Sequence, residues 1–216
     1  MKKYIITGFL LVQILLMYSQ KVFTEGYIIR NTGDTISCYV HPAALVDLQK
    51  KIIVVSDLTE MDKTEYKPFE VKEMNMERYG NYRSKIFEYR YVKDNIKFST
   101  DYNAEEHGEF LKDTAFIRVL VDGKASLYSY TDLLYKTHYF IEKDSLFYEL
   151  YEKMAFKTKA NTSNPNVRVL AVQRKYLGIL SFIFSDNPKI SQKRLMNVKL
   201  KQSELIKIVK EYNSYF

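Results

Sequence analysis

Over the first two thirds of the chain, apolar and polar positions alternate in short runs, a pattern that predicts β-strands. The first two runs, 27–30 and 35–40, flank the tetrapeptide Asn31-Thr32-Gly33-Asp34. Asn, Gly and Asp tolerate the backbone angles of tight turns, so we predict a hairpin in which these residues are structural and Thr35 opens the second strand. A phosphate-binding loop is disfavoured, because it needs more glycine and a following helix.

Several later segments continue this strand pattern. The run 51–57 is β-branched and predicts a strand buried on both faces, and Pro68 begins a predicted single helical turn over 68–71. Asp122-Gly123 lies between two strand patterns and is a preferred pair for a type I′ hairpin turn. The strand at 84–92 alternates Ile86, Glu88 and Arg90 toward solvent with Phe87, Tyr89 and Tyr91 toward the core.

The pattern changes after residue 156. Residues 157–166 form a polar, Asn-rich linker, and 167–186 carries a broad apolar stripe that predicts a helix. A second amphipathic helix near the C-terminus places Leu205, Ile208, Val209 and Tyr212 on one face, with Ser203 as a candidate cap. We therefore predict an α+β fold, in which an antiparallel β sandwich or partly open barrel (20–156) precedes a pair of helices (167–216) packed on it.

The first nineteen residues predict export. Lys2 and Lys3 precede an uncharged run over 4–18, which suits the apolar region of a signal peptide better than a membrane span. We predict cleavage between Ser19 and Gln20, and an exported protein that is periplasmic or associated with the outer membrane, and soluble once cleaved. The alternative is a retained N-terminal anchor, since Met17 is bulky for a cleavage site.

The net charge and the cysteine count bear on two questions, whether the chain binds nucleic acid and whether it contains a disulfide. The chain has 33 Lys and Arg against 26 Asp and Glu, a net charge of +7, without a block of like charges. Nucleic-acid-binding proteins concentrate basic residues, so a nucleic-acid partner is disfavoured. The single cysteine, Cys38, excludes an internal disulfide and is expected to be a small buried apolar residue.

No segment carries a catalytic or metal-binding motif. The three histidines, His41, His107 and His138, lack the spacing of a zinc site, and we expect neither metal nor cofactor. Serine-hydrolase motifs are absent as well. The sequence therefore favours a non-catalytic protein. The alternative is a periplasmic hydrolase of glycans or other envelope polymers, with its site assembled from separate strands.

Tyrosine is the unusual component, with 19 residues and no Trp. Tyrosine suits half-buried strand faces, and it also suits binding surfaces. Three triplets, which begin at Asp34, Asp113 and Asp144, resemble the acceptor motif for O-glycosylation of exported Bacteroidota proteins. This resemblance makes Thr35, Thr114 and Ser145 candidate modification sites, each expected beside a turn.

The segment GYIIRNTGDTISCYV, with Gly26-Tyr27 and Gly33-Asp34-Thr35-Ile36, resembles the first hairpin of a group of uncharacterised exported proteins of the Bacteroidota. Some relatives carry an outer-membrane β-barrel after such a region. The resemblance implies an envelope location and no particular reaction. We therefore expect an envelope protein that binds a protein or a glycan. A third hypothesis, docking onto a membrane-associated complex through the C-terminal helices, requires an exposed apolar face on the last helix.

Overall fold

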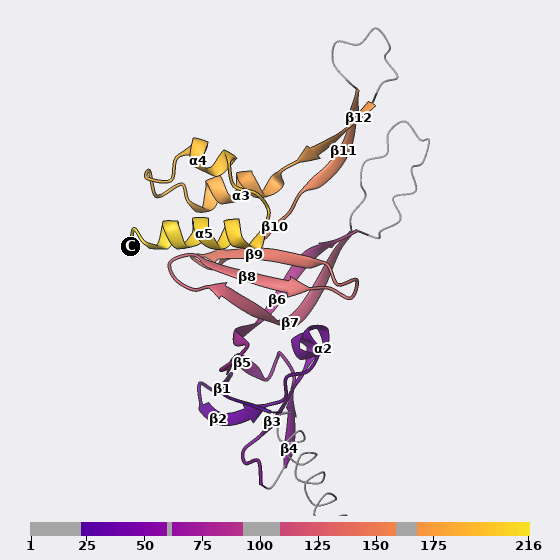
Figure 1. The fold of residues 1–216 in the computed structure, drawn as a ribbon, viewed down its shortest axis with the longest axis vertical. Coiled ribbons are helices and arrows are strands. Elements are labelled where there is room, and N and C mark those ends of the chain that lie inside the picture. Colours follow the sequence, from indigo (N-terminus) through magenta and orange to yellow (C-terminus); the bar gives the residue numbers. More distant parts are fainter. Residues whose placement is uncertain (1–22, 60–61, 93–108, 159–167) are drawn as a thin grey trace, which may run out of the picture. The chain divides into compact units, whose positions relative to one another are not determined.

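The computed structural model describes residues 23–59, 62–92, 109–158 and 168–216 (Figure 1). Its elements are β1 (Thr24–Arg30), β2 (Thr35–Val40), α2 (Leu45–Lys50), β3 (Ile52–Val55), β4 (Lys63–Tyr66), β5 (Val71–Met76), β6 (Gly80–Tyr91), β7 (Glu109–Val121), β8 (Ser126–Thr131), β9 (Thr137–Lys143), β10 (Leu146–Leu150), β11 (Lys153–Thr158), β12 (Arg168–Gln173), α3 (Lys175–Ile183), α4 (Gln192–Met196) and α5 (Gln202–Asn213). Ten strands form an open antiparallel sheet in the order β10-β9-β8-β7-β6-β5-β1-β2-β3-β4, and β11 pairs with β12. The predicted class, mainly antiparallel β with C-terminal helices, is confirmed.

The chain forms two compact units that divide within β6 and β7. The first unit contains β1 to β5, α2, the start of β6 and residues 114–117. Alternate strand residues face its apolar core, which contains Ile28, Cys38, Val40, Leu48, Ile52, Val54, Val71, Met74, Met76, Tyr82 and Phe116. Because successive side chains of a strand point to opposite faces, the intervening residues line the outer face of this sheet.

The second unit contains the end of β6, most of β7 and all later elements. Its core joins the strands to the helices, and the α5 residues Leu205, Ile208, Val209 and Tyr212 are fully buried in it. These four side chains are therefore not available to a partner. A second aromatic cluster has Phe87 at its centre, with the rings of Tyr130 and Phe140 each 4.9 Å away. Burial of Phe87 and Tyr89 confirms the predicted core side of β6.

Three local predictions are wrong. Residues 168–173, expected to start a helix, form β12, because this β-branched segment pairs with β11 along its whole length. Residues 68–70 form a turn closed by a hydrogen bond from the Glu70 N–H to the Lys67 carbonyl, so no helical turn forms there. Ser203 lies inside α5, whose N-cap is Lys201.

The β7–β8 hairpin is present, but its connection is not the predicted type I′ turn. Residues 122–125 separate the strands, and of the predicted pair only Gly123 has a positive φ, of +156°. Asn213 of α5 accounts for the longer loop. Its amide accepts a hydrogen bond from the Ala125 N–H at 2.8 Å and donates to the Ala125 carbonyl at 2.9 Å. A Cβ at Gly123 would lie 2.4 Å from this amide, so a larger residue there would displace the Asn213 side chain.

The β9–β10 hairpin has a type I′ turn, the type that was expected in the β7–β8 hairpin. Asp144 and Ser145 alone connect the two strands, and their φ angles are +48° and +68°. Positive φ at both central residues is the requirement of a type I′ turn. Asn, Asp and Gly are preferred at such positions, so the serine hid this turn from sequence analysis.

Lys143 of β9 is buried and connects the sheet to the helices. Its Nζ donates hydrogen bonds to Asp186 Oδ2 and to the Ile183 carbonyl, both at 2.8 Å. Tyr212 of α5 donates its hydroxyl to both Asp186 oxygens at 3.0 Å. Burial lowers the pKa of Lys143, because it disfavours the charged form. The interactions with Asp186 and Tyr212 outweigh burial, so the pKa of Lys143 is raised overall. The hydrogen bond from Lys143 is the main reason that the pKa of Asp186 is lowered.

We expect the second unit to lose stability as the pH falls through the lowered pKa of Asp186. The contribution of the Asp186 carboxylate to stability is complete above pH 3.8, the ordinary pKa of an aspartate. It is lost at lower pH, because the unfolded chain binds the proton more readily than the folded one. Urea unfolding at about pH 6 and about pH 3 measures this loss, which should be smaller in Asp186→Asn than in the wild type. The exposed Asp62→Asn serves as the control. An equal loss in Asp186→Asn and wild type would contradict the assignment.

Candidate functional site

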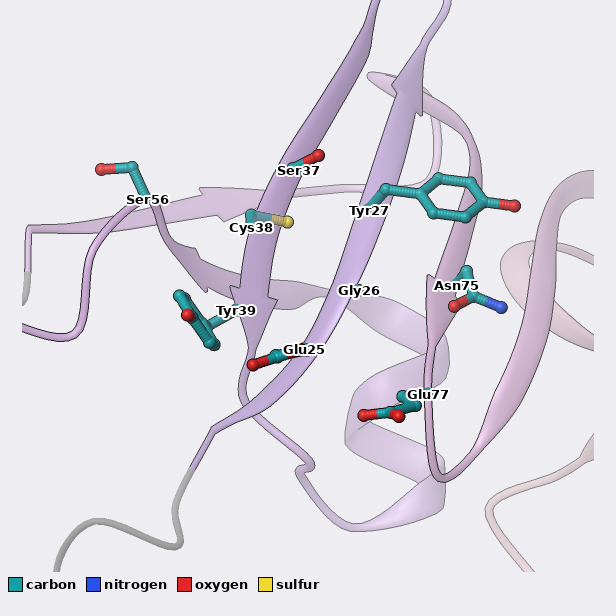
Figure 2. Close-up of a pocket in the computed structure, with 9 residues that line it drawn as sticks. All are labelled: Glu25, Gly26, Tyr27, Ser37, Cys38, Tyr39, Ser56, Asn75 and Glu77. Atoms are coloured by element: carbon teal, nitrogen blue, oxygen red, sulfur yellow. The ribbon is translucent and has the colours of Figure 1, made fainter.

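An open pocket lies on the outer face of β1, β2 and β5 in the first unit, with a volume of about 550 Å³. Figure 2 shows its lining, formed by Glu25, Gly26, Tyr27, Ser37, Cys38, Tyr39, Ser56, Asn75 and Glu77. Strand register places the outward side chains in two rows that run across the three strands. The pocket therefore joins residues of β1 and β2 to residues of β5 about fifty positions away in the chain.

The first row contains Tyr39, Glu25 and Glu77. Glu25 pairs with Tyr39 across the β1–β2 ladder, and the Glu77 N–H donates to the Glu25 carbonyl at 2.9 Å. Within the described part of the chain, neither carboxylate has a salt bridge or a side-chain hydrogen bond, and both residues are exposed. This end of the pocket is therefore acidic, with an aromatic ring beside it.

The second row contains Ser37, Tyr27 and Asn75. Tyr27 pairs with Ser37 on one side and with Asn75 on the other. The row thus offers one aromatic ring between a hydroxyl and an amide. The Asn75 amide nitrogen already donates to Asn81 Oδ1, so the amide offers a ligand its oxygen and its second N–H. Tyr27 and Tyr39 are half-buried, so part of each ring is open to a ligand.

Gly26 allows the strands that carry the pocket to approach closely. A Cβ at this position would lie 2.0 Å from the Asn75 carbonyl oxygen, closer than any real side chain tolerates. Gly26 pairs with Cys38 on β2 and with Met76 on β5. Cys38 is buried as predicted, and burial raises the pKa of its thiol to about 11. A neutral thiol is a poor nucleophile, so Cys38 has a packing role in the pocket floor.

The chemical groups of the pocket suit binding better than catalysis. Two aromatic rings, a hydroxyl and an amide can stack on a ligand and hydrogen-bond to it. Glu25 and Glu77 are the only carboxylates in the lining, and both are exposed. Acid–base catalysis by two carboxyl groups needs environments that separate their pKa values, usually by burying one of them. Neither carboxyl group of this pocket is buried.

Residues 31–34 form the turn that connects β1 to β2. The Gly33 N–H donates to the Arg30 carbonyl, and the Arg30 N–H donates to the Asp34 carbonyl, both at 2.9 Å. Gly33 has a φ of +95°. Hydrogen bonds from Thr32 and Arg30 lower the pKa of Asp34. Arg30, Thr32 and Asp34 thus close the hairpin. The Asn31 side chain instead donates to the Phe69 carbonyl, outside the hairpin.

A buried cluster in the second unit was missed from the sequence. His138 of β9 lies between two carboxylates, with Nδ1 at 2.7 Å from Glu149 and Nε2 at 3.1 Å from Asp132. Glu149 also accepts the Arg90 N–H at 2.7 Å, and Arg90 donates to the Glu152 carbonyl at 3.0 Å. Arg90 was predicted to face solvent but is buried, because these partners satisfy it.

This cluster resembles a catalytic arrangement but has a structural role. The side chains of His138, Asp132 and Glu149 are 3%, 2% and 7% exposed, so no substrate reaches them. Among the described residues, no three His, Cys, Asp or Glu side chains converge to hold a metal ion.

The other predicted residues lie as follows. Thr35 and Ser145 are exposed beside turns, whereas Thr114 lies within β7 and is only partly exposed, contrary to the expected turn position. Their glycosylation stays a prediction. His41 follows β2, and its Nδ1 is buried without a hydrogen-bond partner in the described part of the chain. The cleavage site at Ser19 and Gln20, His107, and most of the linker at 157–166 lie outside the described residues.

Comparisons with protein-family models, with curated proteins and with solved structures find no match to this chain. Across the described residues, none of the helices has the length and apolar character that a membrane crossing requires.

Proposed function

We propose that this protein is a non-catalytic module of the cell envelope that is exported and binds a glycan in the pocket of the first unit. The observation that supports this most strongly is the juxtaposition of Tyr27 and Tyr39 with hydrogen-bonding side chains on one open sheet face. The two lysines and the uncharged run at the N-terminus, together with the resemblance to exported Bacteroidota proteins, support the envelope location.

The composition of the pocket favours a neutral or amino sugar. Aromatic rings present flat apolar area to the C–H face of a sugar, while Ser37 and Asn75 offer donors and acceptors to its hydroxyls. Glu25 and Glu77 accept hydrogen bonds and repel anions. A sulfated glycan should therefore bind less well than a neutral one, although the chain as a whole has a net charge of +7.

A chito-oligosaccharide and a sulfated oligosaccharide, titrated into the purified protein by calorimetry, test this proposal. The neutral sugar should bind, and Tyr27→Ala or Tyr39→Ala should weaken it about tenfold, which corresponds to about 1.4 kcal/mol. Tyr79→Ala is the matched control, because Tyr79 is an exposed tyrosine of the same unit outside the pocket.

Two results would overturn the proposal. One is stronger binding of the sulfated sugar that the tyrosine variants leave unchanged, which would indicate non-specific attraction to basic residues. The other is an equal loss of affinity in Tyr79→Ala. Release of reducing ends from the neutral sugar, abolished by Glu25→Gln or Glu77→Gln, would instead establish the alternative function, a glycan hydrolase.

A further inference from the structure

The β8–β9 turn in the second unit exposes three consecutive large apolar side chains. Leu133, Leu134 and Tyr135 are 70%, 42% and 81% exposed, and we call these three residues the apolar tip. Single exposed apolar residues are ordinary on protein surfaces. A run of three at the end of a hairpin has no stabilising role in the fold, because none of its members is buried in the core. Such a run indicates contact with something outside the chain.

Hydrogen bonds to the buried Asp132 side chain hold the apolar tip in one conformation. Asp132 Oδ1 accepts the Leu134 and Lys136 N–H groups, both at 2.9 Å, and the Asp132 N–H donates to the Lys136 carbonyl at 3.0 Å. The other carboxylate oxygen of Asp132 faces His138 at 3.1 Å. The buried His138 cluster thus fixes the Asp132 side chain that holds the turn. A preorganised tip loses little conformational entropy when it binds.

Tyr135 occupies a backbone conformation that tyrosine rarely adopts, with a φ of +60°. Glycine or asparagine would adopt it at lower cost, and the tyrosine ring makes no compensating contact with the core because it is largely exposed. The large side chain is therefore unfavourable for the turn itself. An unfavourable conformation retained at an exposed position is a reason to seek its role in binding.

The shape and charge of the tip fit a lipid surface. A hairpin end can enter a lipid surface, where leucine side chains partition into the acyl boundary while tyrosine and lysine remain at the headgroups. Lys136, which follows the tip directly, is exposed. We propose that Leu133, Leu134 and Tyr135 insert into the surface of a phospholipid bilayer that carries anionic headgroups.

A second apolar side chain group lies at the same end of these strands. Leu150 of β10 pairs with Tyr139 of β9, so Tyr151 follows at the end where the tip emerges. The ring of Phe110, which is exposed, lies 6.3 Å from that of Tyr151. The contact with lipid proposed here is independent of the pocket in the first unit, so either proposal can fail without the other.

Co-sedimentation of the full chain with vesicles of phosphatidylethanolamine and phosphatidylglycerol tests the inference, at about 0.15 M and about 0.5 M salt. Binding should persist at the higher salt, because apolar insertion is not screened. Leu133→Ser and Leu134→Ser should each lower the partition coefficient about tenfold, the effect of withdrawing one buried leucine. Leu146→Ser is the matched control, since Leu146, like Leu134, is 42% exposed. It is the first residue of β10 and pairs with Lys143, at the end of β9 away from the tip.

Tyr135→Gly separates binding from folding. This variant should weaken binding to vesicles while leaving the midpoint of thermal unfolding unchanged or higher, because glycine relieves the positive φ. The inference is overturned if the wild type does not sediment with vesicles, which would leave a protein partner as the occupant. It is also overturned if binding disappears at the higher salt and the tip variants bind like the wild type, which would show that surface charge alone causes it.

Discussion

Replacing His138 with leucine should lower the free energy of unfolding of the second unit by about 3–5 kcal/mol. The imidazole lies between the Asp132 and Glu149 carboxylates, and all three side chains are buried. Leucine removes both ring nitrogens and leaves the two buried carboxyl groups without that shared hydrogen-bonding partner. Breaking a buried charge network in this way costs more than the intact network contributes, because the remaining charges stay desolvated.

Denaturant unfolding followed by near-ultraviolet circular dichroism measures this effect, since the tyrosine-rich cluster around Phe87 adjoins His138 through Tyr89. Thr137→Ala is the control, because Thr137 is exposed beside His138 and should change stability by less than about 0.5 kcal/mol. Adding Glu149→Gln to His138→Leu should restore part of the loss, since it replaces one of the two buried carboxyl groups with a neutral amide. A His138→Leu variant as stable as Thr137→Ala would show that the cluster contributes nothing.

Gly26→Ala should destabilise the first unit by about 2–3 kcal/mol, although alanine is the smallest change available. Its Cβ would lie 2.0 Å from the Asn75 carbonyl oxygen, which belongs to the backbone of β5 and cannot rotate away. The β1–β5 ladder must therefore separate at this point. The same shift would widen the pocket floor and weaken any ligand bound there.

Gly33→Ala provides the comparison for this effect. Gly33 has a φ of +95°, and no atom lies within 4 Å of the place that a Cβ would occupy, so alanine there meets backbone strain only, about 1 kcal/mol. Chemical unfolding of both variants, monitored in the first unit by hydrogen exchange of the β1 and β5 amides, should rank Gly26→Ala as the less stable. The reverse order would mean that β1 and β5 separate at little cost, so that the close approach of Gly26 to Asn75 does not contribute to stability.

Local patterns predicted the elements whose side chains and backbone satisfy each other nearby. The first hairpin followed from Asn31, Gly33 and Asp34, and the buried face of α5 followed from the spacing of Leu205, Ile208, Val209 and Tyr212. The alternation in β6 identified Phe87 and Tyr89 as buried. In each case the information came from residues close together in the chain.

Distant partners decided the positions where local patterns failed. Arg90 is buried because it donates hydrogen bonds to Glu149 of β10 and to the carbonyl of Glu152, which follows β10. The loop after β7 is longer than expected because Asn213 binds Ala125. Gly26 and Tyr27 of the pocket were singled out as motif residues. Glu25, Tyr39 and Glu77 were not, since only the register of β1 between β2 and β5 brings them together.

Photocrosslinking in the native host tests the central claim, that the outer face of the first unit binds an envelope glycan. A photoreactive phenylalanine analogue replaces Ser37, which is exposed in the pocket, and in a second strain it replaces Tyr79 outside it. We expect a light-dependent, sugar-containing adduct in the envelope fraction from position 37 and none from position 79. Equal adducts from both positions, or none from position 37, would contradict it.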